Sequence, residues 1–519
     1  MEIKKETSYI KNVKCSDIYT DSQTDYVLPD YLGDVRKILF TDATLRPSGR
    51  FAGGEEVDFS GVVVYNVIYL DSDGEISSAE LTSDYDYSVK CSSEGYKDSI
   101  CDTKISAYSV RLSGPRKICA RASLVASVVI SEEGHINVDG VEFEGENSPE
   151  VSIKTINVRA TTPSGLSERE YAEQVLRLDE AIADDVRIIY SNAEAQTESV
   201  NYEDDAVNVK GKIRMQVCLQ HAEEPAYSVE KFVSFDENLD YECENSGVKL
   251  IPHITVTSVK ANVNQDDSGC NIVVSTILEF SVIGERNERV EVITDGYLKK
   301  YASENSYEDF VYDELVSVET VKGNHNAELE RSEIEGENLR EVILVKAVPK
   351  VERIDYTDDK ATLLGEIKYS AIASDVCDDK ITYVPIKFSS PFAIDVKIGC
   401  QNNPNIKLDV KIFAHSPTAS MDANKIYTGC VLDCTVVVGE EKCQRVLSGI
   451  SARENEKYAA LGSSITVYYP HPSETLFSVA KRFHTSSLKI ARDNDISDVV
   501  FASSNPEGTL LGVKKLIIY

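Results

Sequence analysis

The chain repeats a two-part pattern three times, and this feature constrains its fold more than any other. A segment such as GDVRKILFTDA is followed, after a short interval, by a β-rich segment such as FSGVVVYNVIYLD. The three copies lie at 33–43 with 59–71, at 185–195 with 209–220, and at 339–348 with 363–375. Gly61, Gly211 and Gly365 occupy matching points, spaced 150 and 154 residues apart. That spacing is too long for a solenoid and predicts tandem globular domains.

Residues after each matching glycine alternate in the way a β-strand with one buried face requires. In the first copy both faces are largely apolar, which predicts a strand covered on both sides. Asp71-Ser72-Asp73-Gly74 has the composition of a hairpin turn, and long alternating segments close each copy. We therefore predict a mainly β fold with three tandem β-sandwich-like repeats, at 1–150, 151–298 and 299–460. Helical periodicity is best at 168–185, and a second short helix is expected within 308–340.

Residues 464–519 differ in character from the repeats. Ser464–Tyr469 reads as a short strand, and Ser473-Glu474-Thr475-Leu476 opens a helix that Ser473 can cap. A second helix begins at Thr485 or Ser486 and ends near 493–495. A closing strand follows at 514–518. The predicted order is β-α-α-β in about 55 residues, the size of one small module.

The charge of the chain is strongly negative, with 87 acidic against 54 basic residues and a net charge of −33. Such a field repels nucleic acid and anionic lipid, so we expect neither as a direct ligand. The acidic surface serves solubility or attracts a basic partner. Segment 464–519 is almost neutral, since it holds six basic and five acidic residues. A neutral head on an acidic body can dock a protein without long-range repulsion.

Residue types that support catalysis or metal binding form no recognisable motif. The 12 cysteines are scattered without a Cys-x-x-Cys pair, and none of the seven histidines lies in a nucleophile or metal signature. Buried, reduced thiols are the better interpretation, and no catalytic residue, metal site or cofactor is predicted. The N-terminus lacks the apolar segment of a secretory signal and no long apolar run follows. We therefore expect a cytosolic protein that is not an enzyme.

The 464–519 segment resembles the LysM domain family. The resemblance rests on the strand ending VYYP, on SETLFSVAKRFHTSSLKIARDND, and on LLGVKKLII. It implies a shallow groove that in this family binds N-acetylglucosamine polymers. The implied contact residues are Ser473, Glu474, Thr475 and Leu476 on one side, and Ile496, Ser497, Asp498 and Val499 on the other. Ser473 and Glu474 replace the family's Gly and Asp, and a side chain at the Gly position obstructs a glycan, which favours a protein ligand. Glycan binding and a purely structural role stay open.

The three repeats resemble the SPOCS family of Firmicute spore-coat proteins. The elements that carry this resemblance are VRKIL, SGVVVYNVIYL and GPRKICARASL, the last through Arg116, Lys117 and Ile118. It implies a non-enzymatic scaffold in the mother-cell cytoplasm, at the forespore surface, that tethers the spore coat. The implied partners are a SpoIVA-like coat morphogenetic ATPase, bound by the LysM module, and other coat proteins. The alternatives are a peptidoglycan-binding protein of the spore envelope and, less in keeping with the residues, a cell-wall enzyme.

Overall fold

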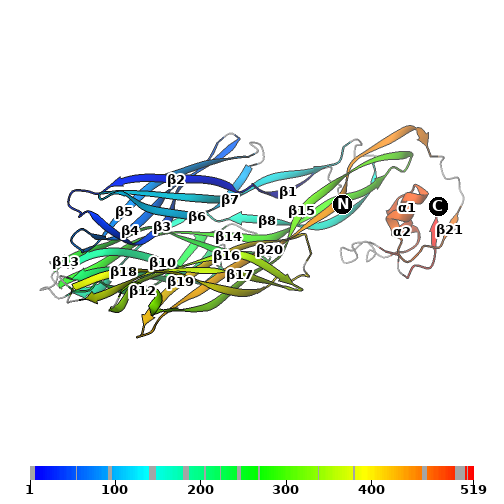
Figure 1. Ribbon diagram of the computed structural model, residues 1–519. Helices are drawn as coiled ribbons and strands as arrows, with labels where there is room; N and C mark the ends of the chain where they lie inside the picture. The colour runs from blue at the N-terminus through cyan, green and yellow to red at the C-terminus, as the bar shows by residue number, and fades with distance from the viewer. Residues whose placement is uncertain are drawn as a thin grey trace.

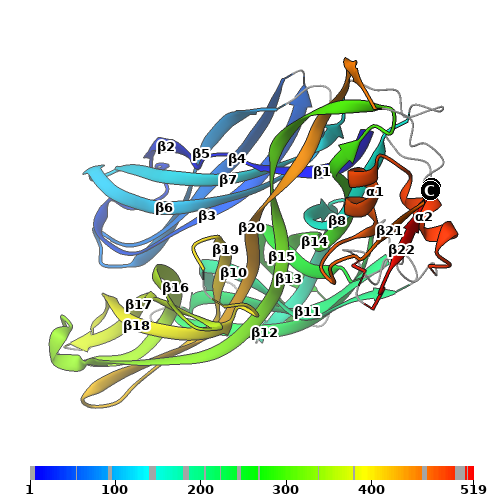
Figure 2. The same ribbon diagram turned by 90° about the vertical axis from the view of Figure 1, so that its right-hand side faces the viewer.

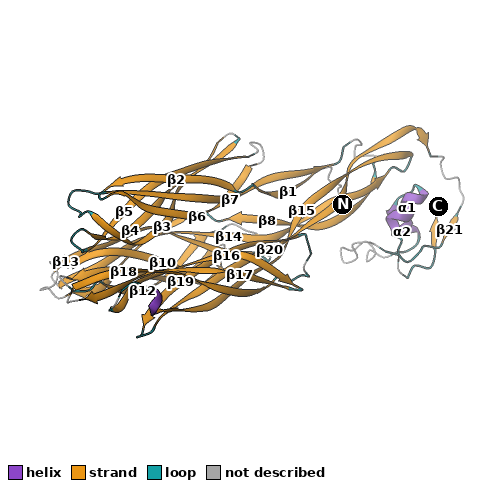
Figure 3. Cartoon of the chain, in the orientation of Figure 1, coloured by secondary structure: helices purple, strands orange, loops and turns teal. Residues whose placement is uncertain are grey.

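The structure is a computed structural model, and it describes most of the chain. The residues outside the description are 1–5, 54, 92–95, 140–147, 179–185, 204–205, 222–223, 242–246, 267–268, 337, 378–379, 402, 459–464, 497–508 and 511. Figure 1 shows an elongated body built of long strands, with a small helical module at one end. The fold is mainly β, as predicted, and the two α-helices among the described residues both lie in that module (Figure 3). No helix among the described residues is long and apolar enough to cross a membrane.

The first repeat consists of two antiparallel sheets that face each other. Its strands, within the described residues, are β1 (Glu6–Lys14), β2 (Ile18–Val27), β3 (Val35–Gly53), β4 (Glu56–Asp71), β5 (Ile76–Lys90), β6 (Tyr96–Gly114) and β7 (Lys117–Asn137). In one sheet, here called the long sheet, β7 is central, with β6 on one side and β1 and β2 in succession on the other. The other sheet, here called the meander sheet, has the order β3-β4-β5.

The second and third repeats have the same two sheets. In the second, β8 (Glu150–Pro163), β9 (Ser167–Leu178), β13 (Lys249–Asp266) and β14 (Gly269–Tyr297) form the long sheet, and β10 (Val186–Glu203), β11 (Ala206–His221) and β12 (Tyr227–Asp240) form the meander sheet. In the third, β15 (Tyr301–Glu330), β19 (Ile406–Met421) and β20 (Lys425–Lys457) form the long sheet, and β16 (Leu339–Thr357), β17 (Lys360–Cys377) and β18 (Lys380–Lys397) form the meander sheet. An edge strand that is split in the first two repeats is continuous in the third, where β15 pairs along β20.

The matching glycines lie at equivalent points of the three meander sheets, each opposite an aromatic residue. The pairs are Gly61 with Tyr85, Gly211 with Phe235, and Gly365 with Phe392. A Cβ added at Gly211 would lie 2.5 Å from a Phe235 ring carbon, and one at Gly61 would lie 2.5 Å from a Tyr85 ring carbon. The aromatic ring therefore occupies the space of the missing side chain, which explains why the repeat carries glycine here.

Apolar side chains fill each sandwich, and a further core joins the three meander sheets to one another. This shared core draws on every repeat: Leu39, Phe40, Ile68, Leu70, Ile76, Ile189, Tyr190, Cys218, Ala226, Ile343, Leu344, Ile372 and Tyr383. Ile68, Cys218 and Ile372 are equivalent, since each stands seven residues after its matching glycine. The three repeats thus meet through corresponding surfaces, and Figure 2 shows them gathered into one body.

Polar contacts also join the repeats, through strands of their long sheets. The Arg159 guanidinium donates two hydrogen bonds, of 2.7 and 2.8 Å, to Glu285, whose side chain is almost fully buried. Arg159 also lies 3.5 Å from the Asp409 carboxylate of the third repeat, which Lys14 of the first repeat approaches to 2.9 Å. Burial opposes the charge of Asp409, but Lys14 and Arg159 outweigh it and lower the pKa of this carboxyl.

Both helices predicted within the repeats are wrong. Residues 168–178 lie in β9, which pairs with β14 and packs Tyr171, Val175 and Leu176 against the core of the second repeat. The remainder of that predicted helix, 179–185, lies outside the described residues. Within 308–340 the chain continues β15 to Glu330 and then makes a single 3₁₀ turn at Arg331–Glu333. Pairing along a long central strand overrides local helical preference in both places.

The C-terminal module has the predicted β-α-α-β order. It contains β21 (Thr466–Tyr468), α1 (Leu476–Phe483), α2 (Ser487–Asp493) and β22 (Leu516–Ile518), with β21 and β22 antiparallel. The predicted cap is displaced, because Thr475 and not Ser473 precedes α1. The Thr475 side chain accepts from the Ser478 N–H, and Ser478 in turn accepts from the Thr475 N–H. This reciprocal pair satisfies two N–H groups at the start of α1.

Candidate functional site

The core of the C-terminal module lies between its two helices and one face of its two-stranded sheet. The buried residues are Leu476, Val479, Ala480, Ile490, Ala491, Leu510, Leu516 and Ile518. Asn494, at the end of α2, links α2 to β22 through its side-chain amide. Its amide donates to the carbonyls of Ile490 and Ile517, at 2.8 and 2.7 Å, and its side-chain oxygen accepts from Ile517 N–H. The module therefore has its own apolar centre.

All four residues predicted for the first side of the groove make contacts within the module, and the Ser473 hydroxyl lies 2.7 Å from His471 Nδ1. The Glu474 carboxylate accepts from the Tyr468 hydroxyl and from the His471 N–H, at 2.8 Å each, and pairs with Arg482 at 2.8 Å. The His471 N–H and the other two partners lower the pKa of this carboxyl. Leu476 is buried in the core, and Ser473 alone is exposed.

Main-chain groups along this predicted rim are also paired. The Glu474 N–H donates to His471 O at 2.9 Å, and the Leu510 N–H donates to Glu474 O at 2.8 Å. Thr475 pairs with Thr509 in an isolated antiparallel bridge. A glycan that approaches here meets few free backbone donors or acceptors.

On the second side of the predicted groove, the structure places only Ile496. Ile496 follows α2, donates its N–H to Ala491 O at 3.0 Å and packs against the module core. Ser497, Asp498 and Val499 lie outside the described residues. The structure therefore brings Glu474, Thr475 and Leu476 together and leaves the facing side defined by a single residue.

The module is attached to the body through the junction between α1 and α2. Tyr297, at the end of β14, is 2% exposed, packs edge-on against Phe477 and donates its hydroxyl to Thr485 O at 2.6 Å. Lys481 pairs with Asp295 at 2.6 Å. The Tyr458 and His484 rings stack with centroids 3.5 Å apart. The body thus contacts α1 at Phe477 and Lys481, and the α1–α2 junction at His484 and Thr485.

The outer face of the module's sheet carries exposed apolar side chains that sequence reasoning missed. Ile465, Val467, Tyr469 and Tyr519 are each about half exposed or more, and Ile517 lies opposite Val467 across the two strands. The intervening Tyr468, together with Leu516 and Ile518, packs into the core. The alternation in SITVYY was the available signal, since it places apolar residues on both faces of a two-stranded sheet. We call Ile465, Val467, Tyr469, Ile517 and Tyr519 the outer sheet face.

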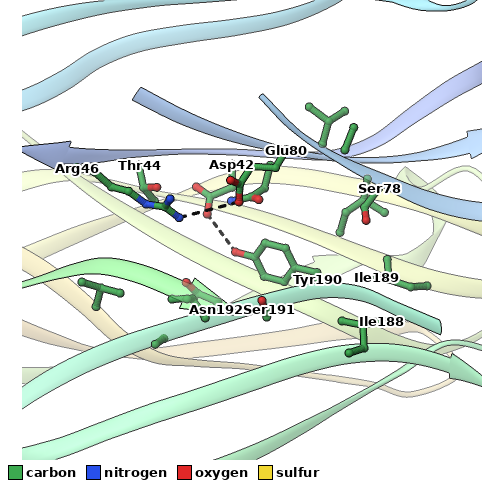
Figure 4. A pocket seen from close by; sticks show the side chains of 17 residues that line it. Asp42, Thr44, Arg46, Ser78, Glu80, Ile188, Ile189, Tyr190, Ser191 and Asn192 are labelled. Atoms are coloured by element: carbon green, nitrogen blue, oxygen red, sulfur yellow. Dashed lines mark hydrogen bonds and ion pairs between the residues drawn. The ribbon is translucent and has the colours of Figure 1, made fainter. Parts of the chain in front are cut away.

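A cavity of about 240 Å³ lies between the meander sheet of the first repeat and strands β10 and β13 of the second. Figure 4 shows Tyr190 reaching toward Asp42 and Arg46 toward Glu80. The Tyr190 hydroxyl donates to Asp42 at 3.1 Å, Lys346 of the third repeat pairs with the same carboxylate, and Arg46 lies 4.0 Å from Glu80. Each charged side chain of the lining thus has a partner. We therefore interpret the cavity as a packing gap at the interface between repeats.

Three cysteines of the described part of the chain, Cys218, Cys430 and Cys434, are buried. Burial raises the pKa of Cys218 to about 12 and that of Cys434 to about 11, so neither is a ready thiolate near neutral pH. Within the described residues, no group of three or more His, Cys, Asp or Glu side chains is placed to hold a metal ion.

Comparisons with protein-family models, with curated proteins and with solved structures gave no match.

Proposed function

We propose that this protein is a non-enzymatic assembly scaffold whose C-terminal module docks a protein partner through the outer sheet face. The resemblance of the repeats to the SPOCS family points to a SpoIVA-like coat morphogenetic ATPase as that partner, and to spore-coat assembly at the forespore as the process. The three repeats act as a body that holds the module and contacts further coat proteins.

The outer sheet face is the observation that carries this proposal. Val467 is 51% exposed, and Ile465, Tyr469 and Tyr519 are exposed beside it on a sheet of only two short strands. Tyrosine is enriched, and charged residues are depleted, at the centre of protein interfaces, and this face carries two tyrosines and no charged side chain. Since the body grips the module at the α1–α2 junction, this face is not used for attachment.

A protein ligand is favoured over a glycan by the state of the predicted groove. The Glu474 carboxylate and the main-chain groups next to it already have intramolecular partners. Sugar recognition depends on free polar groups that converge on the ligand, and breaking these pairs to provide them costs energy. Peptidoglycan binding remains the alternative that the experiment must separate.

The test is the affinity of the full chain for a purified SpoIVA-like ATPase, measured by titration calorimetry. Val467→Glu and Tyr469→Glu each place a charge on the outer sheet face, and we expect each to weaken binding about tenfold or more, about 1.4 kcal/mol. Phe232→Glu is the matched control, since Phe232 is 50% exposed on the body. Ser473→Trp places a large side chain at the rim of the predicted groove. We expect Phe232→Glu and Ser473→Trp to bind the ATPase within about twofold of the parent.

Absence of binding by the folded full chain at micromolar concentrations would contradict the proposal. So would weakening by Ser473→Trp alone. Co-sedimentation of the full chain with purified peptidoglycan, abolished by Ser473→Trp and unaffected by Val467→Glu, would favour the glycan-binding alternative.

A further inference from the structure

Two cysteines of the first repeat lie where its sheets meet at an open edge. Cys15 occupies the break between β1 and β2, and its N–H donates to Val128 O at 2.9 Å. Cys91 follows β5 directly, and its N–H donates to Glu55 O at 2.8 Å. Both side chains are half-buried and pack against the same sandwich core. Cys15 thus belongs to the edge of the long sheet, and Cys91 to the edge of the meander sheet.

The two edge strands, β2 and β5, contact each other across the open edge of the sandwich. The Ser22 hydroxyl of β2 donates to Asp84 O of β5 at 2.8 Å, and it also meets the Ser83 hydroxyl. Cys15 stands seven residues before Ser22, and Cys91 stands seven residues after Asp84. Cys15 precedes the start of β2, and Cys91 directly follows the end of β5, so each cysteine lies at an end of one of these two edge strands.

Electrostatics agree with this placement. Burial raises the pKa of both thiols, and the Glu132 carboxylate raises it further in each, so both thiols lie within range of one side chain. The Cys91 thiol itself contributes to the raised pKa of Cys15. The contact between β2 and β5, the shared core and the electrostatic influence of Cys91 on Cys15 therefore place the two thiols in one neighbourhood.

We propose that Cys15 and Cys91 are a disulfide site, at which oxidation joins the two sheets of the first repeat at their open edge. The bond links the split edge strand of the long sheet to the end of β5, and it closes a loop with 75 intervening residues. Crosslinks that close long loops restrict the unfolded chain, so the oxidised protein unfolds at a higher temperature. In a reducing compartment the pair stays as two thiols, and exposure to a thiol oxidant closes it.

The oxidant is a low-molecular-weight disulfide, RSSR, or a peroxide. With RSSR, the thiolate of one cysteine attacks a sulfur of RSSR and releases RS⁻, which gives a mixed disulfide. The second cysteine, as thiolate, attacks that mixed disulfide and releases another RS⁻. The cysteines lose two protons and two electrons together, and RSSR becomes two RSH. Because the pKa of each thiol is raised, the disulfide forms slowly near neutral pH and faster at alkaline pH, where more of each thiol is ionised.

The test uses the full chain, treated with oxidised glutathione, blocked with an alkylating agent and digested without reduction. Mass spectrometry is expected to find a peptide that links Cys15 to Cys91, in a yield that rises with pH. Thermal unfolding of the oxidised chain is expected to show a higher midpoint than that of the reduced chain. Cys91→Ser removes the linked peptide and the shift. Cys443→Ser leaves both unchanged, since Cys443 is an exposed thiol on β20.

Alkylation of Cys15 and Cys91 as separate thiols at every oxidant concentration, while Cys443 forms a mixed disulfide, would overturn the proposal. Linkage of Cys15 or Cys91 mainly to other cysteines would do the same. Neither outcome bears on the docking proposal, because the outer sheet face belongs to another part of the chain.

Discussion

At the scale of single residues, the matching glycines and the aromatic residues opposite them are the clearest case of cause and structure. In all three repeats a tyrosine or phenylalanine ring covers a glycine of the central meander strand. The ring occupies the space that a side chain would need, and a methyl group there would force the ring or the strand to move. The glycines that recur in the three repeats are thus explained by packing, because each aromatic ring needs the space that a side chain would fill.

Gly211→Ala tests this requirement. The added Cβ would lie 2.1 Å from Gln196 O as well as against Phe235, so we expect a loss of about 1–3 kcal/mol in the free energy of unfolding. Gly323→Ala is the matched control, because a Cβ at Gly323 of β15 meets nothing within 4 Å. Urea denaturation measures both, and equal stability of the two variants would refute the packing explanation.

A partly buried histidine, His253, makes the stability of the body depend on pH. His253 of β13 interacts with Asp102 and Lys104 of β6 and with Lys411 of β19. Burial has the largest effect, and together with the two lysines it lowers the pKa of His253 to about 4. The Asp102 carboxylate acts in the opposite direction and raises this pKa. An unfolded histidine titrates near about 6.5, so as pH falls below that value the unfolded state takes up a proton that the folded state refuses. Stability that is present at neutral pH is therefore lost between about pH 6.5 and about pH 4.

His253→Gln is expected to make the free energy of unfolding less sensitive to pH across this window. Denaturation at about pH 7 and about pH 4.5 measures the difference. His415, whose pKa burial also lowers, acts with the same sign and is present in both proteins. An unchanged slope in His253→Gln would show that this histidine is not the cause.

At the scale of elements, sequence patterns predicted the strands and the order of elements in the C-terminal module. They failed where strand pairing, and not local preference, decides between helix and strand. The alternation after Gly61 and the β-α-α-β order of the C-terminal segment are local signals, so they could be read directly. Segment 168–178 has the residue types of a helix, yet it pairs with β14 over a distance of about a hundred residues. The outer sheet face was missed for a related reason, since only the fold shows which face of β21 lies away from the helices.

Attachment of the module depends on Tyr297. Tyr297→Ala removes a buried ring from the module core together with its hydrogen bond to Thr485 O. We expect faster hydrogen exchange in α1 and α2 and faster proteolytic release of the module, with the meander sheets unaffected. Tyr469→Ala, on the outer sheet face, is the control and should leave both rates as in the parent.

At the scale of the whole molecule, the three repeats pack against one another and form one body, and they are not separate domains joined only by linkers. A core shared by the three meander sheets and an ionic cluster from three repeats hold them together. Arg159→Met leaves the Glu285 carboxylate, 3% exposed, without its main partner, and we expect a loss of about 3–5 kcal/mol. The double variant Arg159→Met, Glu285→Leu should recover much of that loss, and a double variant no more stable than the single one would contradict this view of the cluster.

The most direct test of the docking account is a hydrogen-exchange footprint of the full chain with and without the SpoIVA-like ATPase. The account predicts slower exchange at 465–469 and 516–519 in the complex, with little change around Tyr297 and the α1–α2 junction. Protection confined to the repeats, or protection at the α1–α2 junction with none on the outer sheet face, would contradict it.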